Sequence, residues 1–233
     1  MKCVVMNFSG NVGKSTVARH LLAPRMGDCE IIAVETINSD GTEVEGIKGK
    51  QFDDLVEALA LKDAAVIDVG ASNVEVFMKL MEKQRGSHED FDYFVIPTVA
   101  VKKQMRDTIS TVEELSRIGV SPDRIKMVFN RVDFDDDARR EFAPIIDYHD
   151  DHKRFSLSLS ALIEENEFFS KAQGASINEV LADTTDYKAL IKAAESTEDK
   201  LSCAEKITVR RLAASAKDNL DDVFKSLFGK GKK

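Results

Sequence analysis

Long apolar runs, paired cysteines and an excess of basic residues are all missing from this 233-residue sequence. No apolar run approaches the length of a membrane-spanning helix and no signal peptide precedes the first predicted strand, so we expect a cytoplasmic protein. The cysteines Cys3, Cys29 and Cys203 are odd in number and lack metal-ligand spacing, which also favours a reducing cytosol. A net charge of −8 argues against direct nucleic-acid binding, which needs a basic surface.

A glycine-rich segment near the N-terminus carries the strongest functional signal. It follows an apolar run at residues 2–6, ends in Gly13-Lys14-Ser15-Thr16, and precedes apolar residues at helical spacing. Backbone N–H groups of such a loop converge on a phosphate, the lysine reaches the β- and γ-phosphates, and the serine ligates Mg²⁺. The competing interpretation is a Gly/Ser turn followed by an exposed lysine. The predicted nucleotide-binding residues of the loop are Gly10, Asn11, Val12, Gly13, Lys14, Ser15 and Thr16.

Strand and helix signals alternate along most of the chain. Strands are predicted at 2–6, 30–35, 64–69, 93–97, 125–129 and 154–159, and helices at 51–61, 73–85, 102–118, 161–172, 179–194 and 198–228. This alternation predicts an α/β fold with a mostly parallel sheet and helices on both faces. We expect a nucleotide-binding domain at residues 1–195 and a helical C-terminal extension at 196–233.

An acidic residue, Asp68, stands where the third predicted strand ends. Nucleotides bind parallel sheets at the carboxyl ends of the strands. A carboxylate there can hold Mg²⁺ through a water or sense the γ-phosphate, so Asp68 joins Ser15 as a candidate metal residue. The alternative is an ordinary strand-end acid that faces solvent.

The phosphate loop departs from the full motif, because Phe8 stands where the first glycine is expected. The remaining part, from Gly10 to Ser15, resembles the variant loops of the ParA/MinD group of ATPases, which also carry a segment similar to residues 68–70. The resemblance implies ATP and Mg²⁺ as cofactors, Lys14 and Asp68 as catalytic residues, and a homodimer formed on nucleotide binding. The lysine that crosses the dimer interface in that group is Ser9 here, which puts the usual nucleotide-sandwich dimer in question.

A second departure from the ParA/MinD pattern follows the second predicted strand. Members of that group usually carry Asp-x-Asp there, and the second acid positions the attacking water. In this sequence Glu35 takes the first position and Ile37 the second, with Asp40 three residues further on. We therefore expect hydrolysis that is slow or dependent on a partner.

Base recognition is assigned to Asn130, which follows the fifth predicted strand. ParA/MinD proteins carry an asparagine there that hydrogen-bonds the adenine ring. The run from Asn130 to Asp133 also resembles the purine-reading segment of GTPases, in which the aspartate binds guanine. GTPases carry Asp-x-x-Gly at the third strand, however, and here Gly70 falls one residue early. ATP is thus expected, with a GTPase switch as the alternative.

Within the ParA/MinD group the chain is most similar to the StbB plasmid stability proteins of conjugative plasmids. This resemblance implies a role in plasmid stability, positioning and conjugative transfer, with a separate plasmid DNA-binding protein as partner. Two other functions stay open: an ATP-dependent metabolic enzyme on the same fold, and a binding module whose ATP site has decayed.

The C-terminal segment, residues 219–233, combines an apolar helical face with a basic end. The apolar face comprises Leu220, Val223, Phe224, Leu227 and Phe228. The lysines of the segment are Lys225, Lys230, Lys232 and Lys233. The segment resembles the membrane-targeting tail of MinD, which implies peripheral contact with the inner membrane. The alternative is a helix that packs on the domain or on a partner.

Overall fold

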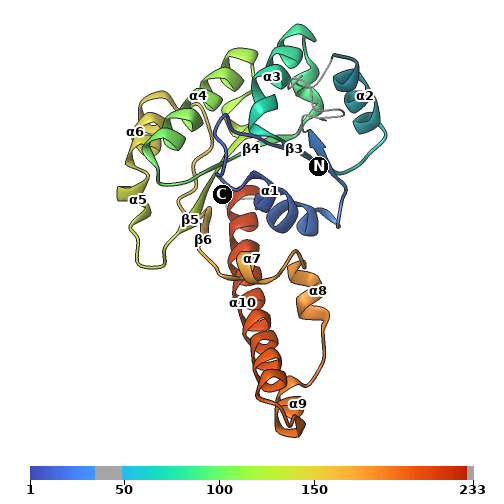
Figure 1. Ribbon diagram of the computed structural model, residues 1–233. Helices are drawn as coiled ribbons and strands as arrows, with labels where there is room; N and C mark the ends of the chain where they lie inside the picture. Colours follow the sequence, from blue (N-terminus) through green and yellow to red (C-terminus); the bar gives the residue numbers. More distant parts are fainter. Residues whose placement is uncertain (35–48, 230–233) are drawn as a thin grey trace.

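The computed structural model describes residues 1–34 and 49–229, and its centre is a parallel β-sheet (Figure 1). The strands are β1 (Lys2–Val5), β2 (Ile31–Val34), β3 (Ala65–Val69), β4 (Tyr93–Thr98), β5 (Ile125–Val132) and β6 (Leu162–Glu164). They form a 6-stranded sheet in the order β2-β3-β1-β4-β5-β6, and every neighbouring pair is parallel. The predicted fold class is therefore confirmed.

Helices connect the strands. The α-helices are α1 (Lys14–Thr16), α2 (Gly49–Ala60), α3 (Val74–Lys83), α4 (Lys102–Ile118), α5 (Ala138–Glu141), α6 (Ala143–His152), α7 (Phe168–Lys171), α8 (Ile177–Ala182), α9 (Tyr187–Ala193) and α10 (Thr197–Phe228). A π-helical stretch (Val17–Leu22) and a 3₁₀ turn (Ala23–Met26) continue α1. Further 3₁₀ turns are Ala71–Asn73, Ser87–Asp90 and Pro122–Arg124.

Several predicted elements in the second half of the chain were wrong. The segment predicted as the strand 154–159 makes one isolated parallel bridge, Ser156 to Lys126, and the sixth strand lies later, at Leu162–Glu164. That strand and α7 occupy the region predicted as the helix 161–172. The predicted helix 179–194 is two helices, α8 and α9, with a break between them where Asp183 and Asp186 bind backbone N–H groups.

The alternation of side chains along the strands divides the core into two layers. On β1, Val4 points into a cluster with α2, α3, α4 and α6, whereas Cys3 and Val5 point into a cluster with the π-helical stretch, α7, α8 and α10. The other inner strands alternate in the same way, because successive strand residues face opposite sides of a sheet. Both faces of the sheet are therefore covered, as a parallel sheet requires.

The second half of α10 belongs to this core. Leu220, Val223 and Leu227 are at most 6% exposed, and Phe224 and Phe228 pack against the same cluster. Of the two interpretations of this face, the structure shows the helix that packs on its own domain, so these side chains are not available for membrane contact. Residues 230–233 lie outside the described residues.

Polar contacts also fix α10 to the sheet. The Asn219 side chain donates to the Leu162 carbonyl at 3.0 Å and accepts from the Glu164 N–H at 3.2 Å, so it pairs with the edge strand β6. Arg25 forms an ion pair of 2.7 Å with Asp221. These contacts anchor the C-terminal half of the helix at two places.

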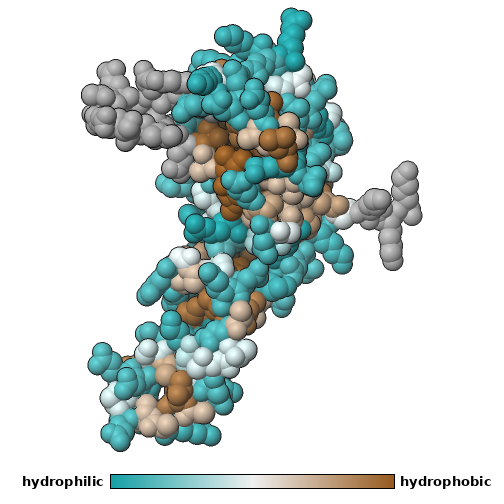
Figure 2. Space-filling model, turned by 90° about the vertical axis from the view of Figure 1, so that its right-hand side faces the viewer, coloured by the Kyte–Doolittle hydropathy of each residue, from teal (hydrophilic) through white to brown (hydrophobic). Residues whose placement is uncertain are grey.

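The first half of α10 extends away from the sheet with α9 packed beside it, and Figure 2 shows the same broad upper part and narrow lower part. The domain boundary expected at residues 195 and 196 falls in the short connection between α9 and α10. Within residues 1–34 and 49–229, no helix is both long and apolar enough to span a membrane.

Candidate nucleotide-binding site

The loop after β1 lies at the carboxyl edge of the sheet, beside the end of β3. β3 and β4 flank β1, so the chain changes sides at β1 and leaves a crevice at its carboxyl end. Within the loop Asn11 has φ +58° and Gly13 has φ +89°, both in the left-handed region. The helical segment begins at Lys14, where the Val17 N–H donates to the Gly13 carbonyl at 2.9 Å. The loop thus presents a helix N-terminus to the crevice.

The predicted phosphate-binding lysine, Lys14, folds back over its own loop. Its Nζ donates to the Ser9 carbonyl at 2.8 Å and more weakly to the Asn7 carbonyl at 3.4 Å. Burial lowers the pKa of Lys14, and the negative charge of Asp68 opposes that shift. The ammonium group is therefore held inside the loop by carbonyls that a phosphate could replace as its partners.

The carboxylate of Asp68 lies beside this loop, because β1 and β3 pair with Val5 opposite Asp68. The residue is only 8% exposed, and its Oδ1 is buried without a hydrogen-bond partner among the described residues. An ionised oxygen in that condition is costly unless a cation or a bound water satisfies it. Asp68 thus fits a Mg²⁺ site, together with Ser15, which is exposed at the start of the helix.

The predicted base-reading residue, Asn130, contacts the phosphate loop. It is 4% exposed, and its Nδ2 donates to the Val12 carbonyl at 2.8 Å across 118 residues of sequence. A Cβ added to Gly13 would lie 2.1 Å from that Nδ2. The Asn130 amide therefore packs directly on Gly13 and requires a glycine there.

A cleft of about 380 Å³ opens next to Asn130. It lies between Thr16 at the start of the helix and the segment that follows β6, which contributes Glu164 and Asn166. The pairing of β5 with β6 shifts register between Asn130 and Val132, and Arg131 between them has φ +55°. This irregularity buries Asn130 against the loop while Arg131 lines the cleft.

The GTPase-type aspartate, Asp133, is not part of the lining of this cleft in the described structure. It is exposed in the turn after β5, where its carboxylate accepts from the Asp135 N–H at 3.3 Å. The two residues of the GTPase-like segment, Asn130 and Asp133, therefore have different surroundings.

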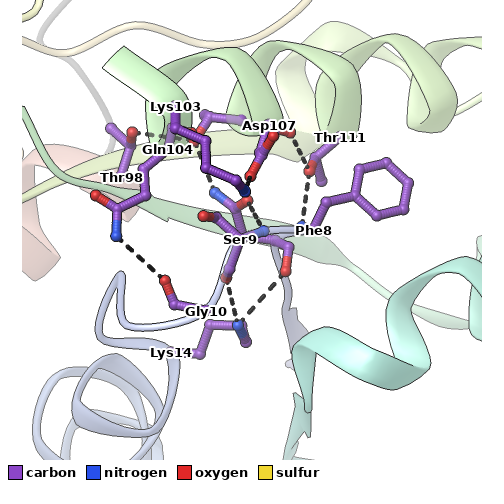
Figure 3. A network of polar contacts seen from close by, with 11 residues as sticks. Phe8, Ser9, Gly10, Lys14, Thr98, Lys103, Gln104, Asp107 and Thr111 are labelled. Carbon is purple, nitrogen blue, oxygen red and sulfur yellow. Dashed lines mark hydrogen bonds and ion pairs between the residues drawn. The ribbon is translucent and has the colours of Figure 1, made fainter. Parts of the chain in front are cut away.

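Helix α4 supports the start of the loop through contacts that sequence reasoning missed (Figure 3). The Asn7 side chain donates to Thr108 at 2.7 Å and to the Pro97 carbonyl at 2.9 Å, and it accepts from the Ser9 N–H at 2.8 Å. The Phe8 N–H donates to the Thr111 hydroxyl at 3.1 Å. The only sequence signal for this support was two threonines on the otherwise apolar buried face of α4.

Ser9, at the position of the interface-crossing lysine, points inward. It is 4% exposed, and its hydroxyl hydrogen-bonds the Asp107 carboxyl on α4. The pKa of that carboxyl is lowered first by its hydrogen bond with Lys103 and also by the one with Ser9. The start of the loop is thus hydrogen-bonded to α4 of the same chain. Glu35, Ile37 and Asp40, the other candidate catalytic positions, lie outside the described residues.

The parallel sheet, with a glycine-bearing loop and a helix start at the end of its first strand, is the arrangement of the P-loop fold. The buried carboxylate of Asp68 lies at the same crevice. Solved structures of MinD and of a ParA family ATPase share the fold of this chain. The MinC:MinD cell division protein complex of Aquifex aeolicus matches with a TM-score of 0.57 and 12% identity, covering 100% of this chain and 97% of that chain.

Two further structures support the same fold. The septum site-determining protein MinD complexed with Mg-ADP, from Pyrococcus horikoshii OT3, has a TM-score of 0.54 and 11% identity and covers 98% of this chain and 96% of its own. A ParA family ATPase from Chlorobium tepidum TLS has a TM-score of 0.52 and 14% identity, covering 94% and 96%. No family model matches the chain, and no curated protein sequence matches it significantly.

Proposed function

We propose that this protein is a nucleotide-dependent molecular switch that binds Mg-ATP at the loop from Gly10 to Thr16 and hydrolyses it slowly. The single observation that carries the proposal is that two buried charged side chains, Lys14 and Asp68, lie at the same loop without a salt bridge between them. Lys14 is held by loop carbonyls, and Asp68 has a buried oxygen without a partner among the described residues. A bound phosphate would take over the lysine, and a cation would satisfy the carboxylate.

Each residue of this chain then has a distinct task. The backbone N–H groups around Gly13 and the helix N-terminus receive the phosphates, while Lys14 contacts the β- and γ-phosphates. Ser15 and Asp68 hold Mg²⁺, directly or through water. When bound, the ion neutralises charge that develops on the phosphates during transfer. With Ile37 in place of a second acid, little in the sequence positions the attacking water, which supports slow or partner-stimulated hydrolysis.

The proposal favours ATP over GTP. The Asn130 amide donates one N–H to the Val12 carbonyl, which fixes the orientation of the amide, and the Oδ1 acceptor has no hydrogen bond to the loop. An acceptor complements the 6-amino group of adenine and repels the 6-oxo group of guanine. The exposed position of Asp133, away from the cleft lining, gives no support to the GTPase alternative.

The biological role rests on the resemblance to StbB proteins. We propose that the switch acts in plasmid stability, positioning and conjugative transfer, with a separate plasmid DNA-binding protein as partner and with a homodimer that forms on nucleotide binding. The net charge of −8 is consistent with DNA contact through a partner rather than through this chain.

Two measurements test this function. Competition of unlabelled ATP, ADP, GTP and GDP against a fluorescent ATP analogue, with and without Mg²⁺, should rank ATP first. Plasmid retention without selection should fall when the plasmid encodes Asp68→Asn, whereas the exposed-site control Glu195→Gln should retain the plasmid normally. Equal retention for both variants, or tighter binding of GTP, would contradict the proposal.

A further inference from the structure

A second cleft, of about 440 Å³, lies between α3 and α4 at the start of the phosphate loop. Phe8 and Met78 contribute its apolar surface. Figure 3 shows the Phe8 ring directed away from the loop, next to Thr111 of α4. Phe8 is half-buried, so a large apolar residue of the loop itself is accessible from this cleft.

The charged side chains around this cleft are mostly acidic. The acidic ones are Glu75, Glu82, Glu113 and Glu114, and the basic ones are Lys79 and Arg117, so four negative and two positive charges leave −2. Lys79 pairs with Glu75 at 2.6 Å, and Arg117 pairs with Glu82 at 2.5 Å and Glu114 at 2.7 Å. Glu113 is exposed and lies on α4 one turn from Arg117. The site therefore combines an apolar surface with uncompensated negative charge.

The cleft is connected to the nucleotide site through the backbone of Phe8. The Phe8 N–H is bonded to Thr111, and the neighbouring Ser9 carbonyl accepts from Lys14 Nζ at 2.8 Å. A displacement of Phe8 would therefore move the carbonyl that holds Lys14. A ligand that displaces Phe8 when it binds would therefore change the affinity for nucleotide. Nucleotide would in turn change the affinity for that ligand by the same factor.

We propose that this cleft is a docking site for a basic segment of a partner protein that inserts an apolar side chain against Phe8 and Met78. Charge complementarity selects this occupant, because lysine or arginine side chains would meet Glu113 and the excess of carboxylates. The same charge repels nucleic acid and anionic lipid. The docking stands apart from the proposed function, whereas its effect on nucleotide affinity rests on that function.

A synthetic amphipathic peptide of leucine and lysine, labelled with fluorescein, tests the proposal by fluorescence anisotropy on the full chain. Glu113→Lys brings the charge of the cleft to zero and should weaken binding by about five- to tenfold. Glu195→Lys makes the same change of total charge at an exposed position between α9 and α10, and should bind like the parent. Saturating Mg-ATP should shift the peptide affinity of the parent, and the shift should shrink in Phe8→Ala.

Three results would overturn the proposal. These are no peptide binding by the parent, equal loss in Glu113→Lys and Glu195→Lys, or tighter binding of an anionic vesicle or an oligonucleotide than of the peptide at this cleft. Peptide binding that Mg-ATP does not change, in a protein that calorimetry shows to bind Mg-ATP, would retain the docking site but refute its coupling to the loop. A protein that binds the peptide and no nucleotide would instead refute the proposed function.

Discussion

Replacing Asn130 by alanine should weaken the binding of phosphates, and not only of the base. The Nδ2 of Asn130 donates to the buried Val12 carbonyl at 2.8 Å and packs on Gly13, the residue whose left-handed backbone starts the helix. A ligand that carries three phosphates and no base separates the two tasks. Mg-tripolyphosphate binding by isothermal calorimetry should therefore fall in Asn130→Ala.

The magnitude follows from the lost hydrogen bond. Removing the donor leaves the Val12 carbonyl, in a residue that is 0% exposed, without its partner, at a cost of about 1–3 kcal/mol. If the loop must adopt the braced conformation to bind phosphate, about 1–2 kcal/mol of that cost appears as a five- to thirtyfold loss of affinity. Asn130→Asp keeps the shape but replaces the donor by a carboxylate that repels the Val12 carbonyl and the phosphates, so it should weaken binding at least as much as the alanine variant.

A matched control lies in the same cleft. Asn166 donates to the Leu212 carbonyl and accepts from the Phe168 N–H, so its hydrogen bonds do not involve the phosphate loop, and Asn166→Ala should leave tripolyphosphate affinity unchanged. The reasoning is refuted if Asn130→Ala binds tripolyphosphate as tightly as the parent while its ATP affinity falls. In that case Asn130 would act on the base alone.

Three other predictions concern Asp68, α10 and His20. Asp68→Asn should keep its fold by circular dichroism yet lose about tenfold or more of the Mg²⁺ enhancement of ATP binding, and an unchanged enhancement would remove Asp68 from the metal site. Because Leu220 is 1% exposed, Leu220→Ala should lower the free energy of unfolding in urea by about 2–5 kcal/mol. The control Asp222→Ala, at an exposed position, should lower it by less than about 0.5 kcal/mol. Equally small effects of the two substitutions would show that α10 does not belong to the core. Burial, and secondarily the charge of Arg19, lower the pKa of His20 to about 4 from an ordinary 6.5, so the unfolded chain binds more protons between these values and stability should fall as the pH drops from about 6.5 to 4. His20→Gln should flatten that decline in urea unfolding measured at pH 7 and pH 5, and an equally steep decline would contradict the assignment.

Local patterns predicted the elements that are long and strongly periodic. The helix expected at 102–118 is α4, with its boundaries unchanged, and the strand before the phosphate loop ends within one residue of its expected end. Such elements have buried positions at regular spacing, so the pattern alone defines them. In contrast, α6 and β6 were not predicted. The buried residues of α6 are Ile145 and Ile146, next to a run of acidic residues, and β6 has three residues, which are too few to show a period.

Sequence reasoning could propose the candidate site only from residues that form local motifs. The loop around Lys14 and the strand-end Asp68 follow from local motifs, and the pairing of β1 with β3 brings them together. The contact between Asn130 and Val12 spans 118 residues, and that between Asn7 and Thr108 spans 101. No local pattern encodes contacts at that separation, because they depend on how the strands are ordered in the sheet.

The sequence also could not predict which surface covers the apolar face of α10. The spacing of Leu220, Val223 and Leu227 correctly indicated a helix with one apolar face. Periodicity reports that such a face must be covered, but a membrane, a partner protein and the chain's own sheet satisfy it equally. The structure shows the sheet as the cover, with Asn219 paired to β6.

Lys14→Ala, measured by isothermal calorimetry with Mg-ATP, tests the central claim most directly. Lys14 is the cation of the loop, and its Nζ is held 2.8 Å from the Ser9 carbonyl, where an incoming phosphate can take it over. The account predicts that the parent binds Mg-ATP and that the variant binds at least about a hundredfold more weakly, which corresponds to about 2.8 kcal/mol, while it unfolds like the parent. Equal Mg-ATP affinity in the two proteins would contradict the assignment of this loop as a phosphate-binding site.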